Sequence, residues 1–497
     1  MQKFGRIALA ISLAVSSVQF VYGFDKTEPK EVPVLAPESQ HVASSKRITA
    51  QFTRAHFKKV SIDDELSSQI FDRYIKQLDY SRNVFLVSDI EELEKYRNDF
   101  DSVVARGKLD VAYEIYNLNV KRRIERFEYA LSLLEKPFDF TLDEDYLFDR
   151  EKQSWSKNVA ELNELWRLKV KYDVLSLTLA KKEWPKIQET LTKRYKYAIK
   201  RIKQSESEDV FQMVMNSFAR VVEPHTSYLS PKNAERFQME MNLSLEGIGA
   251  VLRAEEDYTV IQSVVTGGPA DKSNQLKPKD KIVGVAQAKG EFEDVVGWRL
   301  DDVVDLIKGP KGTEVRLQIE SGESDSDENL KVVSIIRDKI KLEDRAAKSE
   351  VYLEQTSEGT QRKLGVIDIP SFYNNLSRDV KKEITKLKAE NVEGIIVDLR
   401  GNGGGSLTEA TLLTGLFIDK GPVVQVLNQK KFVEVQRDLD GVTYYDGPLT
   451  VMVDRYSASA SEIFSAALQD YGRAVIVGEH TFGKGTVQQH RPLGRVY

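Results

Sequence analysis

The stretch Glu393–Ile418, EGIIVDLRGNGGGSLTEATLLTGLFI, passes from a short apolar run through a glycine-rich turn into a longer run. A short apolar run before such a turn is typical of a buried strand, and the longer run predicts a helix. The same alternation recurs on both sides, with strands expected at KLGVIDIPSF, LTVMVD and AVIVGE and helices at DVKKEITKLKAE and EIFSAALQDYG. Apolar strands that alternate with helices predict an α/β core with largely parallel pairing over residues 343–497.

The glycine-rich turn lies where a strand ends and a helix begins, which is where open α/β sheets bind ligands. Glycines let backbone N–H groups converge, and a helix start adds a positive dipole. The turn therefore predicts an anion cradle for a phosphate or an oxyanion, with a flexible turn as the alternative. It is not a dinucleotide-binding motif, because Ser406 stands where that motif needs glycine. Its glycines are Gly401, Gly403, Gly404 and Gly405.

A second strand-to-helix turn, DRYSASASEIF, carries Ser457, Ser459 and Ser461. Two interpretations are open. Ser459 and Glu462 have the spacing of a capping box, so these serines could simply begin a helix. Alternatively, one of them is a nucleophile on a turn whose alanines leave room for a substrate, although the turn lacks the G-x-S-x-G pattern.

A third turn, GEHTFGKGT at Gly478–Thr486, nearly matches a phosphate-binding loop. That loop needs a hydroxyl directly after its lysine and then a helix. Here Gly485 follows Lys484, and TVQQHRPL is expected to form a strand, so phosphate binding is disfavoured. A serine nucleophile needs a base, and His480 and His490 are near but have no obvious orienting carboxylate. A neutral lysine is the other option, since burial and neighbouring donors can lower a lysine pKa from its usual value of about 10.4.

The rest of the chain reads as two further domains. Residues 24–240 are expected to be a helical N-terminal domain, in which Leu66, Ile70, Tyr74 and Leu78 repeat every four residues on a helix that Ser61 or Asp64 could cap. Residues 241–342 read as short strands with one helix, a compact β module. The predicted fold class is therefore a multidomain α+β protein with an α/β core at its C-terminal end.

Composition narrows the function. The 497 residues carry a net charge of −5, with basic and acidic residues mixed, so no nucleic-acid partner is expected. Cysteine is absent, which excludes thiol catalysis and cysteine metal sites. Only five histidines are present and no H-E-x-x-H occurs, so neither a metal nor a cofactor is expected.

The N-terminus has the pattern of an export signal. A basic start, MQKFGR, precedes the apolar run IALAISLAVSSVQFV, and Gly23 offers a small residue at the cut. The alternative is a membrane anchor, but a span needs about 20 apolar residues and the run is shorter. We therefore expect residues 1–23 to be a cleaved signal peptide and the mature protein to be exported.

Several motifs together resemble the C-terminal processing peptidases, which are periplasmic serine–lysine endopeptidases with an inserted PDZ domain. The resemblance runs from about residue 50 to the end of the chain. It rests on EPHTSYLSP, SLEGIGAVL, GWRLDDVVDLIKGPKGTEVRL, DLRGNGGGSLTEA and SASASEIFSAALQDYGRAVIVGEHTFGKGTVQQ. The resemblance implies a serine-type endopeptidase that cleaves through an acyl-enzyme.

The resemblance also assigns roles to individual residues. The family's nucleophile matches Ser459 and its general base matches Lys484. A third catalytic member has been placed in two ways in this family, which fall here on Gln488 or on Asp470. Eleven residues along a helix span about 16 Å, so Asp470 would not touch Ser459, and we prefer Gln488 as the orienting residue.

Backbone N–H groups would supply the oxyanion site in such an enzyme. The resemblance places these donors at Ala460 and at a glycine of the glycine-rich turn, Gly405 or Gly404.

The β module is then expected to be a PDZ domain at 241–342. Its carboxylate-binding loop matches Gly247, Ile248, Gly249 and Ala250, beside a strand edge on which an extended peptide can pair. The implied substrates are proteins with apolar C-termini, cell-wall enzymes among them. The implied partner is an outer-membrane lipoprotein adaptor on the helical region. The implied location is the periplasm, either free or peripheral at the inner membrane.

The chain departs from the family at its end, since relatives continue well beyond Tyr497. We therefore expect the peptidase core at 343–497 to be C-terminally incomplete. A rival interpretation follows, in which the chain is an inactive PDZ scaffold that binds protein tails without cutting them.

Overall fold

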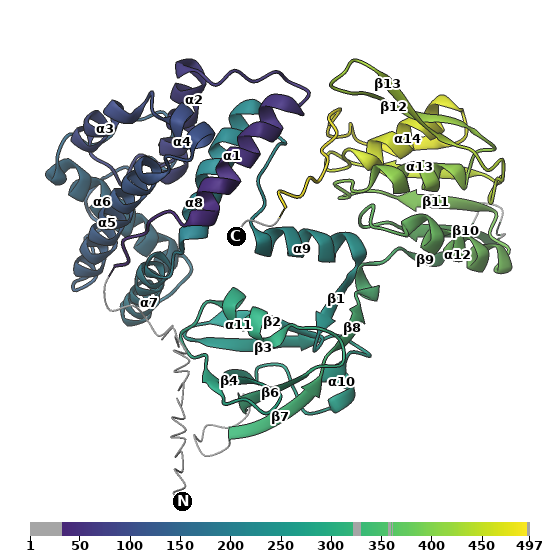
Figure 1. The fold of residues 1–497 in the computed structure, drawn as a ribbon. Coiled ribbons are helices and arrows are strands. Elements are labelled where there is room, and N and C mark those ends of the chain that lie inside the picture. Colours follow the sequence, from purple (N-terminus) through teal and green to yellow (C-terminus); the bar gives the residue numbers. More distant parts are fainter. Residues whose placement is uncertain (1–31, 322–329, 356–358, 360, 495–497) are drawn as a thin grey trace, which may run out of the picture.

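The computed structural model describes residues 32–494 apart from 322–329, 356–358 and 360, so the expected signal peptide at 1–23 lies outside the described residues. Within them the chain forms a helical region, a β module and an α/β region, in that order along the sequence (Figure 1). The predicted multidomain α+β class is confirmed.

The helical region is built from amphipathic helices. In α2, Leu66, Ile70, Tyr74 and Leu78 are all buried, as their spacing predicts. The cap is neither of the two residues expected: the side chain of Asp63 accepts the N–H of Leu66 at 2.9 Å. The elements are α1 (Ser39–Arg54), α2 (Asp64–Leu78), α3 (Val87–Leu93), η1 (Glu94–Tyr96), α4 (Phe100–Arg106), α5 (Asp110–Leu133), α6 (Val159–Leu179), α7 (Trp184–Lys203), α8 (Ser207–Val222) and α9 (Pro231–Asn242).

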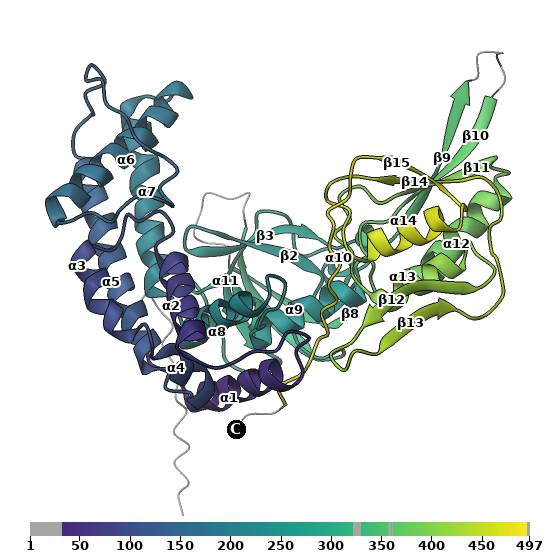
Figure 2. The same cartoon turned by 90° about the horizontal axis from the view of Figure 1, so that it is seen from above.

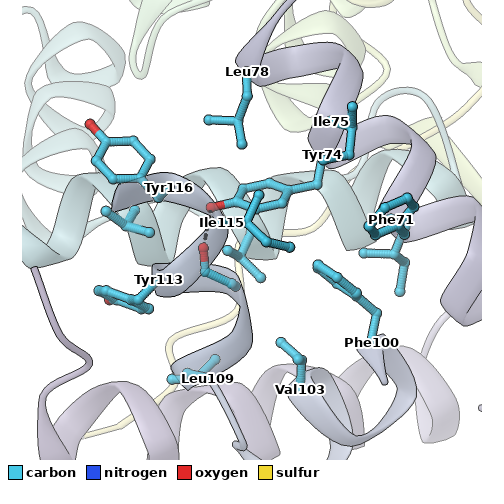
Figure 3. Close-up of a cluster of buried hydrophobic side chains, with 14 of the residues drawn as sticks. Phe71, Tyr74, Ile75, Leu78, Phe100, Val103, Leu109, Tyr113, Ile115 and Tyr116 are labelled. Atoms are coloured by element: carbon cyan, nitrogen blue, oxygen red, sulfur yellow. Dashed lines mark hydrogen bonds between the residues drawn. The ribbon is translucent and has the colours of Figure 1, made fainter. Parts of the chain in front are cut away.

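Aromatic and aliphatic side chains together form a buried cluster in this region (Figure 3). Phe71 and Phe100 meet edge to face, with ring centroids 5.9 Å apart. Tyr74 is fully buried, and its hydroxyl donates to the carbonyl of Ala112 at 2.9 Å, so its one polar atom is satisfied. The helices are thus held as one packed body rather than by their individual propensities.

The β module is a sheet with two short helices. Its strand order is β2-β3-β4-β6-β7, all antiparallel, with β5 on β4, while β1 and β8 form a separate antiparallel ribbon. α11 contacts β2, the strand at one edge of the sheet. The elements are β1 (Ser244–Gly247), β2 (Ala250–Glu255), β3 (Tyr258–Val264), α10 (Pro269–Ser273), β4 (Lys281–Gln287), β5 (Glu293–Asp294), α11 (Leu300–Ile307), β6 (Glu314–Glu320), β7 (Leu330–Ile336) and β8 (Asp338–Lys341).

The α/β region contains a five-stranded sheet in the order β15-β14-β11-β10-β9. The first four strands pair in parallel, as predicted, and β9 adds an antiparallel edge strand. The elements are η2 (Glu343–Arg345), β9 (Lys348–Gln355), β10 (Gln361–Asp368), α12 (Leu376–Ala389), β11 (Gly394–Asp398), α13 (Leu407–Gly415), β12 (Gly421–Leu427), β13 (Val433–Asp438), β14 (Leu449–Val453), α14 (Ala460–Asp470) and β15 (Val475–Gly478).

The order of these strands follows the sequence from β10 to β15, so right-handed crossovers place the connecting helices on one face. α12, α13 and α14 pack side by side there, and the β12–β13 hairpin lies against α13 and α14 (Figure 2). The parallel strands therefore end at a common edge, where the loops after β10, β11, β14 and β15 gather.

Ion pairs hold the β module against the helical region. Arg299, just before α11, reaches Asp209 of α8 at 2.9 Å, and Lys200 of α7 pairs with Asp257 in the β2–β3 turn. α9 runs between the regions (Figure 1). Among the helices of the described residues, none combines the length and the apolar character needed to cross a membrane.

The end of the chain differs from its prediction. TVQQHRPL was expected to be a strand, but residues 479–494 contain no helix or strand, so that prediction is wrong. A strand needs a neighbouring strand to accept its backbone hydrogen bonds. Instead the segment crosses to the helical side, where His490 stacks on Phe237 and the carbonyl of Leu493 accepts from Arg47 at 2.7 Å (Figure 2).

Candidate active site

Three segments meet at the carboxyl edge of the parallel sheet. We call them the glycine loop (residues 399–406, after β11), the nucleophile turn (residues 454–460, after β14) and the lysine segment (residues 479–488, after β15). Each segment follows a strand of the sheet, and neighbouring strands lie about 5 Å apart. The sheet therefore brings together residues that are far apart in the sequence: Lys484 follows Ser459 by 25 positions and Gly404 by 80.

The two serines of the nucleophile turn, Ser457 and Ser459, and Ser461 in the first turn of α14 have different surroundings. Ser457 is fully buried, and its hydroxyl donates to the carbonyl of Leu399 at 2.8 Å. Ser461 is fully buried too, and its hydroxyl donates to the carbonyl of Asn402 at 2.9 Å. Ser459 is half-buried, and its side chain makes no cap hydrogen bond to α14. Of the three hydroxyls, only that of Ser459 is open to a substrate.

The backbone of Ser459 is strained. Its φ is 57° and its ψ is −112°, a conformation that residues with a Cβ rarely adopt. Strain of this kind persists only where the surroundings impose it, and it gathers at functional sites. Here it turns the chain abruptly from β14 into α14 and leaves the Ser459 side chain at the helix start.

Glu462 connects the nucleophile turn to the lysine segment. Its Oε2 accepts the backbone N–H of Ser459 at 2.7 Å and that of Lys484 at 3.0 Å. Its Oε1 accepts the N–H of Gly483 at 2.6 Å and the hydroxyl of Thr481 at 2.8 Å. One carboxylate thus places the two residues that sequence analysis paired as nucleophile and base.

These donors also determine the charge of Glu462. Burial on its own raises the pKa of this carboxyl, but the hydrogen bonds from Thr481, Gly483, Ser459 and Lys484 outweigh it, and the net pKa is lowered. Glu462 is therefore an anion at neutral pH and accepts all four bonds in its charged form. Charge-assisted bonds are stronger than neutral ones, so the arrangement is held firmly.

The glycine loop lies directly on the nucleophile turn. A Cβ on Gly404 would be 2.6 Å from the carbonyl of Ala458 and 2.9 Å from the Cβ of Ser459. A Cβ on Gly405 would be 2.3 Å from the carbonyl of Phe372. Both glycines also have positive φ, at 97° and 145°. Only glycine permits this approach.

The N–H groups at this contact divide into used and free donors. That of Gly404 donates to Asn402 Oδ1 at 2.9 Å and is not available to an oxyanion. Those of Gly405 and Ala460 have no acceptor among the described residues. Ala460 is the first residue of α14, where the helix dipole adds positive potential. The geometry therefore favours Gly405 and Ala460 over Gly404 as oxyanion donors.

The other site residues predicted from sequence are farther from this centre. Asp470 is exposed at the C-terminal end of α14, the opposite end from Ser459. Gln488 is exposed, and its amide donates to the hydroxyl of Thr486 rather than to Lys484. His480 is exposed and His490 stacks on Phe237, so the structure gives neither histidine a place beside Ser459.

The second predicted site is the loop between β1 and β2. Gly247 ends β1, Ile248 is buried as an anchor, Gly249 has a φ of 76°, and Ala250 begins β2. The carbonyl of Ile248 accepts the N–H of Ala270 in α10, and that of Gly249 accepts the N–H of Val265. The N–H groups of Ile248 and Gly249 have no acceptor among the described residues. Lys308, after α11, lies beside Gly247. The Lys308 ammonium itself pairs with Glu235 and Asp305, so the open N–H groups of the loop are what fits a carboxylate.

Three parts of the sequence match known families. Residues 48–232 match the Tail specific protease N-terminal domain, residues 236–320 the PDZ domain, and residues 363–496 Peptidase family S41. A Tail-specific protease from Haemophilus influenzae is 47% identical over 489 residues, which cover 98% of this chain and 69% of that relative.

The chain belongs to the tail-specific proteases. It is a serine-type peptidase with a helical N-terminal region, a PDZ domain and an S41 peptidase core. A Probable CtpA-like serine protease from Staphylococcus aureus is 34% identical over 271 residues, 54% of this chain and 50% of that relative. Among solved structures, the PDZ domain of a carboxy-terminal protease from Vibrio cholerae is 57% identical, covering 20% of this chain and 100% of that one, with a TM-score of 0.19.

Sequence reasoning missed what holds this site together. Glu462 was visible only as the partner of Ser459 in a capping box, and the structure shows that its carboxylate also binds the lysine segment. The spacing of Ser459 and Glu462 was a signal for the first role. No local pattern indicates the second, because Lys484 is 22 residues away from Glu462.

Proposed function

We propose that this tail-specific protease is a serine–lysine endopeptidase in which Ser459 is the nucleophile and Lys484 is the general base. One observation carries the proposal: the backbone N–H groups of both residues bind the same oxygen of Glu462, next to the one serine hydroxyl of the nucleophile turn that is not buried. Lysine can serve as a base where histidine is not at hand.

The proposed reaction begins when the Lys484 amine takes the hydroxyl proton of Ser459. The Ser459 oxygen bonds to the scissile carbonyl carbon, and the carbonyl electron pair moves to its oxygen. The N–H groups of Gly405 and Ala460 bind this oxyanion, which is where preorganised donors contribute most to the rate. The C–N bond then breaks as Lys484 returns its proton to the leaving amine, and water hydrolyses the acyl-enzyme by the same route.

For the third member we propose Gln488 as the residue that orients Lys484. Both lie on the lysine segment, so a modest change of its irregular backbone can bring them together when a substrate binds. We assign Asp470 a structural or electrostatic role, because it lies at the far end of α14.

Substrate capture is proposed for the loop formed by Gly247, Ile248, Gly249 and Ala250. The free carboxylate of a protein tail would bind there, and the tail would extend along the edge of β2, opposite α11. This fits proteins with apolar C-termini, because Leu252 of β2 and Leu306 of α11 are partly buried apolar side chains that pack against the module's core.

We further propose a periplasmic location, reached by cleavage of residues 1–23, with envelope proteins such as cell-wall enzymes as substrates. A lipoprotein adaptor of the outer membrane is the proposed partner of the helical region. Fractionation of cells that produce the complete gene product tests the location: the protein should be released with the periplasmic contents, and retention in the cytoplasm would contradict it.

The test of the chemistry uses a peptide with an apolar C-terminus, whose cleavage is followed by mass spectrometry. Ser459→Ala and Lys484→Ala should each abolish cleavage while tail binding, measured by fluorescence anisotropy, persists. Matched controls are Ser176→Ala on α6 and Lys382→Ala on α12, both exposed and far from the site, which should cleave as the parent protein does. Full cleavage by Lys484→Ala would overturn the dyad.

The rival, an inactive scaffold that only binds tails, is decided by the same assay. It predicts tail binding without fragments from the unaltered protein. The open Ser459 hydroxyl and the unused N–H groups of Gly405 and Ala460 favour the enzyme, since a binding module needs neither.

A further inference from the structure

Asn402 is a buried amide at the centre of the glycine loop. It is fully buried, and both ends of its side chain are bonded: Oδ1 accepts the N–H of Gly404 at 2.9 Å, and Nδ2 donates to the carbonyl of Ile369 at 2.7 Å. Ile369 directly follows β10, whereas Gly404 lies in the loop after β11. The Asn402 side chain therefore bridges the loops of two neighbouring strands.

The backbone of Asn402 extends this bridge to a third strand. Its carbonyl accepts the N–H of Ala458 at 3.1 Å and the hydroxyl of Ser461 at 2.9 Å. Ala458 directly precedes Ser459, and Ser461 follows it by two positions, so the two residues lie on either side of the turn into α14. A single residue thus ties the loops after β10, β11 and β14 together beneath the nucleophile.

The contact that Asn402 maintains is a close one. Gly404 lies so near to Ala458 and Ser459 that no Cβ fits between them. Asn402 holds the N–H of Gly404, and the N–H of Phe372 donates to the carbonyl of Gly404 at 2.9 Å, so the peptide groups on both sides of Gly404 are fixed. The N–H of Gly405 stays without an acceptor among the described residues. Turning one peptide in a glycine loop costs little, so the loop needs such a hold.

We propose that Asn402 is the positioning residue of the oxyanion site: its amide fixes the Gly404 peptide so that the Gly405 N–H meets the oxyanion formed on Ser459. Asn402 itself does not touch the substrate. The inference rests on the proposed function, because it presupposes that Ser459 attacks a carbonyl. It adds a residue whose effect falls on the transition state rather than on substrate binding.

A purely structural role makes different predictions. Loss of a buried hydrogen-bonding amide lowers stability wherever it lies. Asn119 of α5 is a matched control, because it is 1% exposed and its amide donates to the carbonyl of Leu78 at 3.1 Å, far from Ser459. Asn119→Ala should lower the melting temperature without changing kcat for the folded enzyme.

The experiment compares Asn402→Ala, Asn402→Asp and Asn119→Ala in the complete gene product. For each we would measure melting temperature, kcat and KM on a tail peptide, and inhibition by a matched peptide aldehyde. The aldehyde adds reversibly to a serine, and its oxygen then occupies the oxyanion site. Asn402→Asp keeps an acceptor for the Gly404 N–H but loses the donor to Ile369, so it separates the two bonds.

The expected result for Asn402→Ala is a fall in kcat of about 10- to 100-fold with KM changed by less than about 2-fold. Aldehyde affinity should fall by a similar factor, and Asn402→Asp should retain more of both. Unchanged kcat and aldehyde affinity in a folded Asn402→Ala protein would overturn the inference. So would losses no larger than those of Asn119→Ala. If Asn402→Ala does not fold, Asn402→Asp is judged by the same criteria.

Failure of the proposed function would look different. In that case the unaltered enzyme forms no hemiacetal with the aldehyde at Ser459, so native mass spectrometry shows no mass increase that is lost in Ser459→Ala. If the unaltered enzyme forms the adduct and the Asn402 variants form it equally well, the dyad stands and only the role of Asn402 is lost.

Discussion

The turn that carries Ser459 and the segment that carries Lys484 meet at one carboxylate, yet the two are held in different ways. The nucleophile turn is fixed by buried, bonded residues on both sides of Ser459, although Arg455 and Tyr456 are exposed: the Ser457 hydroxyl reaches the carbonyl of Leu399, and Ala460 begins α14 with 1% exposure. The lysine segment has no helix or strand and is mostly exposed. It is attached by its bonds to Glu462, by the N–H of Phe482 on the carbonyl of Ser457, and at its start by the N–H of Glu479 on the carbonyl of Val453.

This difference separates two requirements of the chemistry. The nucleophile and the oxyanion donors must be preorganised, because their value depends on sub-ångström placement before the substrate arrives. The base has to accept one proton and return it, so a segment held by a few hydrogen bonds between residues 479 and 484 is sufficient. Changes in the rigid part should therefore act on kcat directly, whereas changes in the lysine segment should act through Glu462.

The largest effect is expected from the rigid part. Gly404→Ala would place a Cβ 2.6 Å from the Ala458 carbonyl and must push the glycine loop off the nucleophile turn. We expect kcat to fall by about 100-fold or more, since a displacement of about 1 Å in an active site can have that effect. Gly403→Ala is the control on the same loop, because a Cβ there meets nothing within 4 Å. Equal activities of the two variants would show that the loop is not rigid.

A smaller loss of kcat is expected when the hydrogen bonds between Glu462 and the lysine segment are weakened. Glu462→Gln replaces two accepting oxygens by one, so the donors from Thr481 and Gly483, or those from Ser459 and Lys484, lose their acceptor. We expect kcat to fall about 10- to 100-fold, the equivalent of losing a charge-assisted bond. Hydrogen exchange should speed up in the lysine segment and not in α14. Exchange that speeds up equally in both would mean that the two parts are not held separately.

The same carboxylate gives the site an acid limit. The pKa of Glu462 is lowered in the folded protein. The stabilisation that its ionised carboxylate gives the folded site is therefore fully present at pH values above the ordinary glutamate pKa. It is lost as the pH falls through the lowered pKa of the folded state. Protection of the lysine segment from hydrogen exchange should therefore persist through mildly acidic pH and disappear below the usual glutamate range. Glu462→Gln should lack this transition. A transition of the same midpoint in the variant would assign it to another group.

The smallest changes in kcat are expected from Asp470 and Gln488, the two candidates for the third catalytic residue. Asp470→Asn, at the far end of α14, should change kcat by no more than about 2-fold, as most exposed substitutions do. Gln488→Ala should lower kcat by up to about 10-fold with little effect on KM, because it orients the base only in the substrate complex. A larger loss from Asp470→Asn than from Gln488→Ala would reverse the assignment.

Most helices and strands of the α/β region could be predicted from the sequence, because the patterns that indicate them span only a few neighbouring residues. The strand–turn–helix order around Glu393–Ile418 predicted a parallel sheet, and the glycine loop was placed correctly between β11 and α13. The β12–β13 hairpin and the antiparallel strand β9 were not predicted. The strand expected at TVQQHRPL did not form, because a strand depends on a partner that may be distant in sequence, and the sequence around it contains no such information.

The sequence by itself determined the types of elements, the three serines on one turn, and Lys484 among glycines, since these follow from residue type and short spacing. Which serine is open was decided only by tertiary structure, because burial and bonding of Ser457 and Ser461 depend on the glycine loop. The same holds for Glu462 and Asn402. Their side chains act on groups from other strands of the sheet, and a one-dimensional pattern does not specify which strand ends will meet.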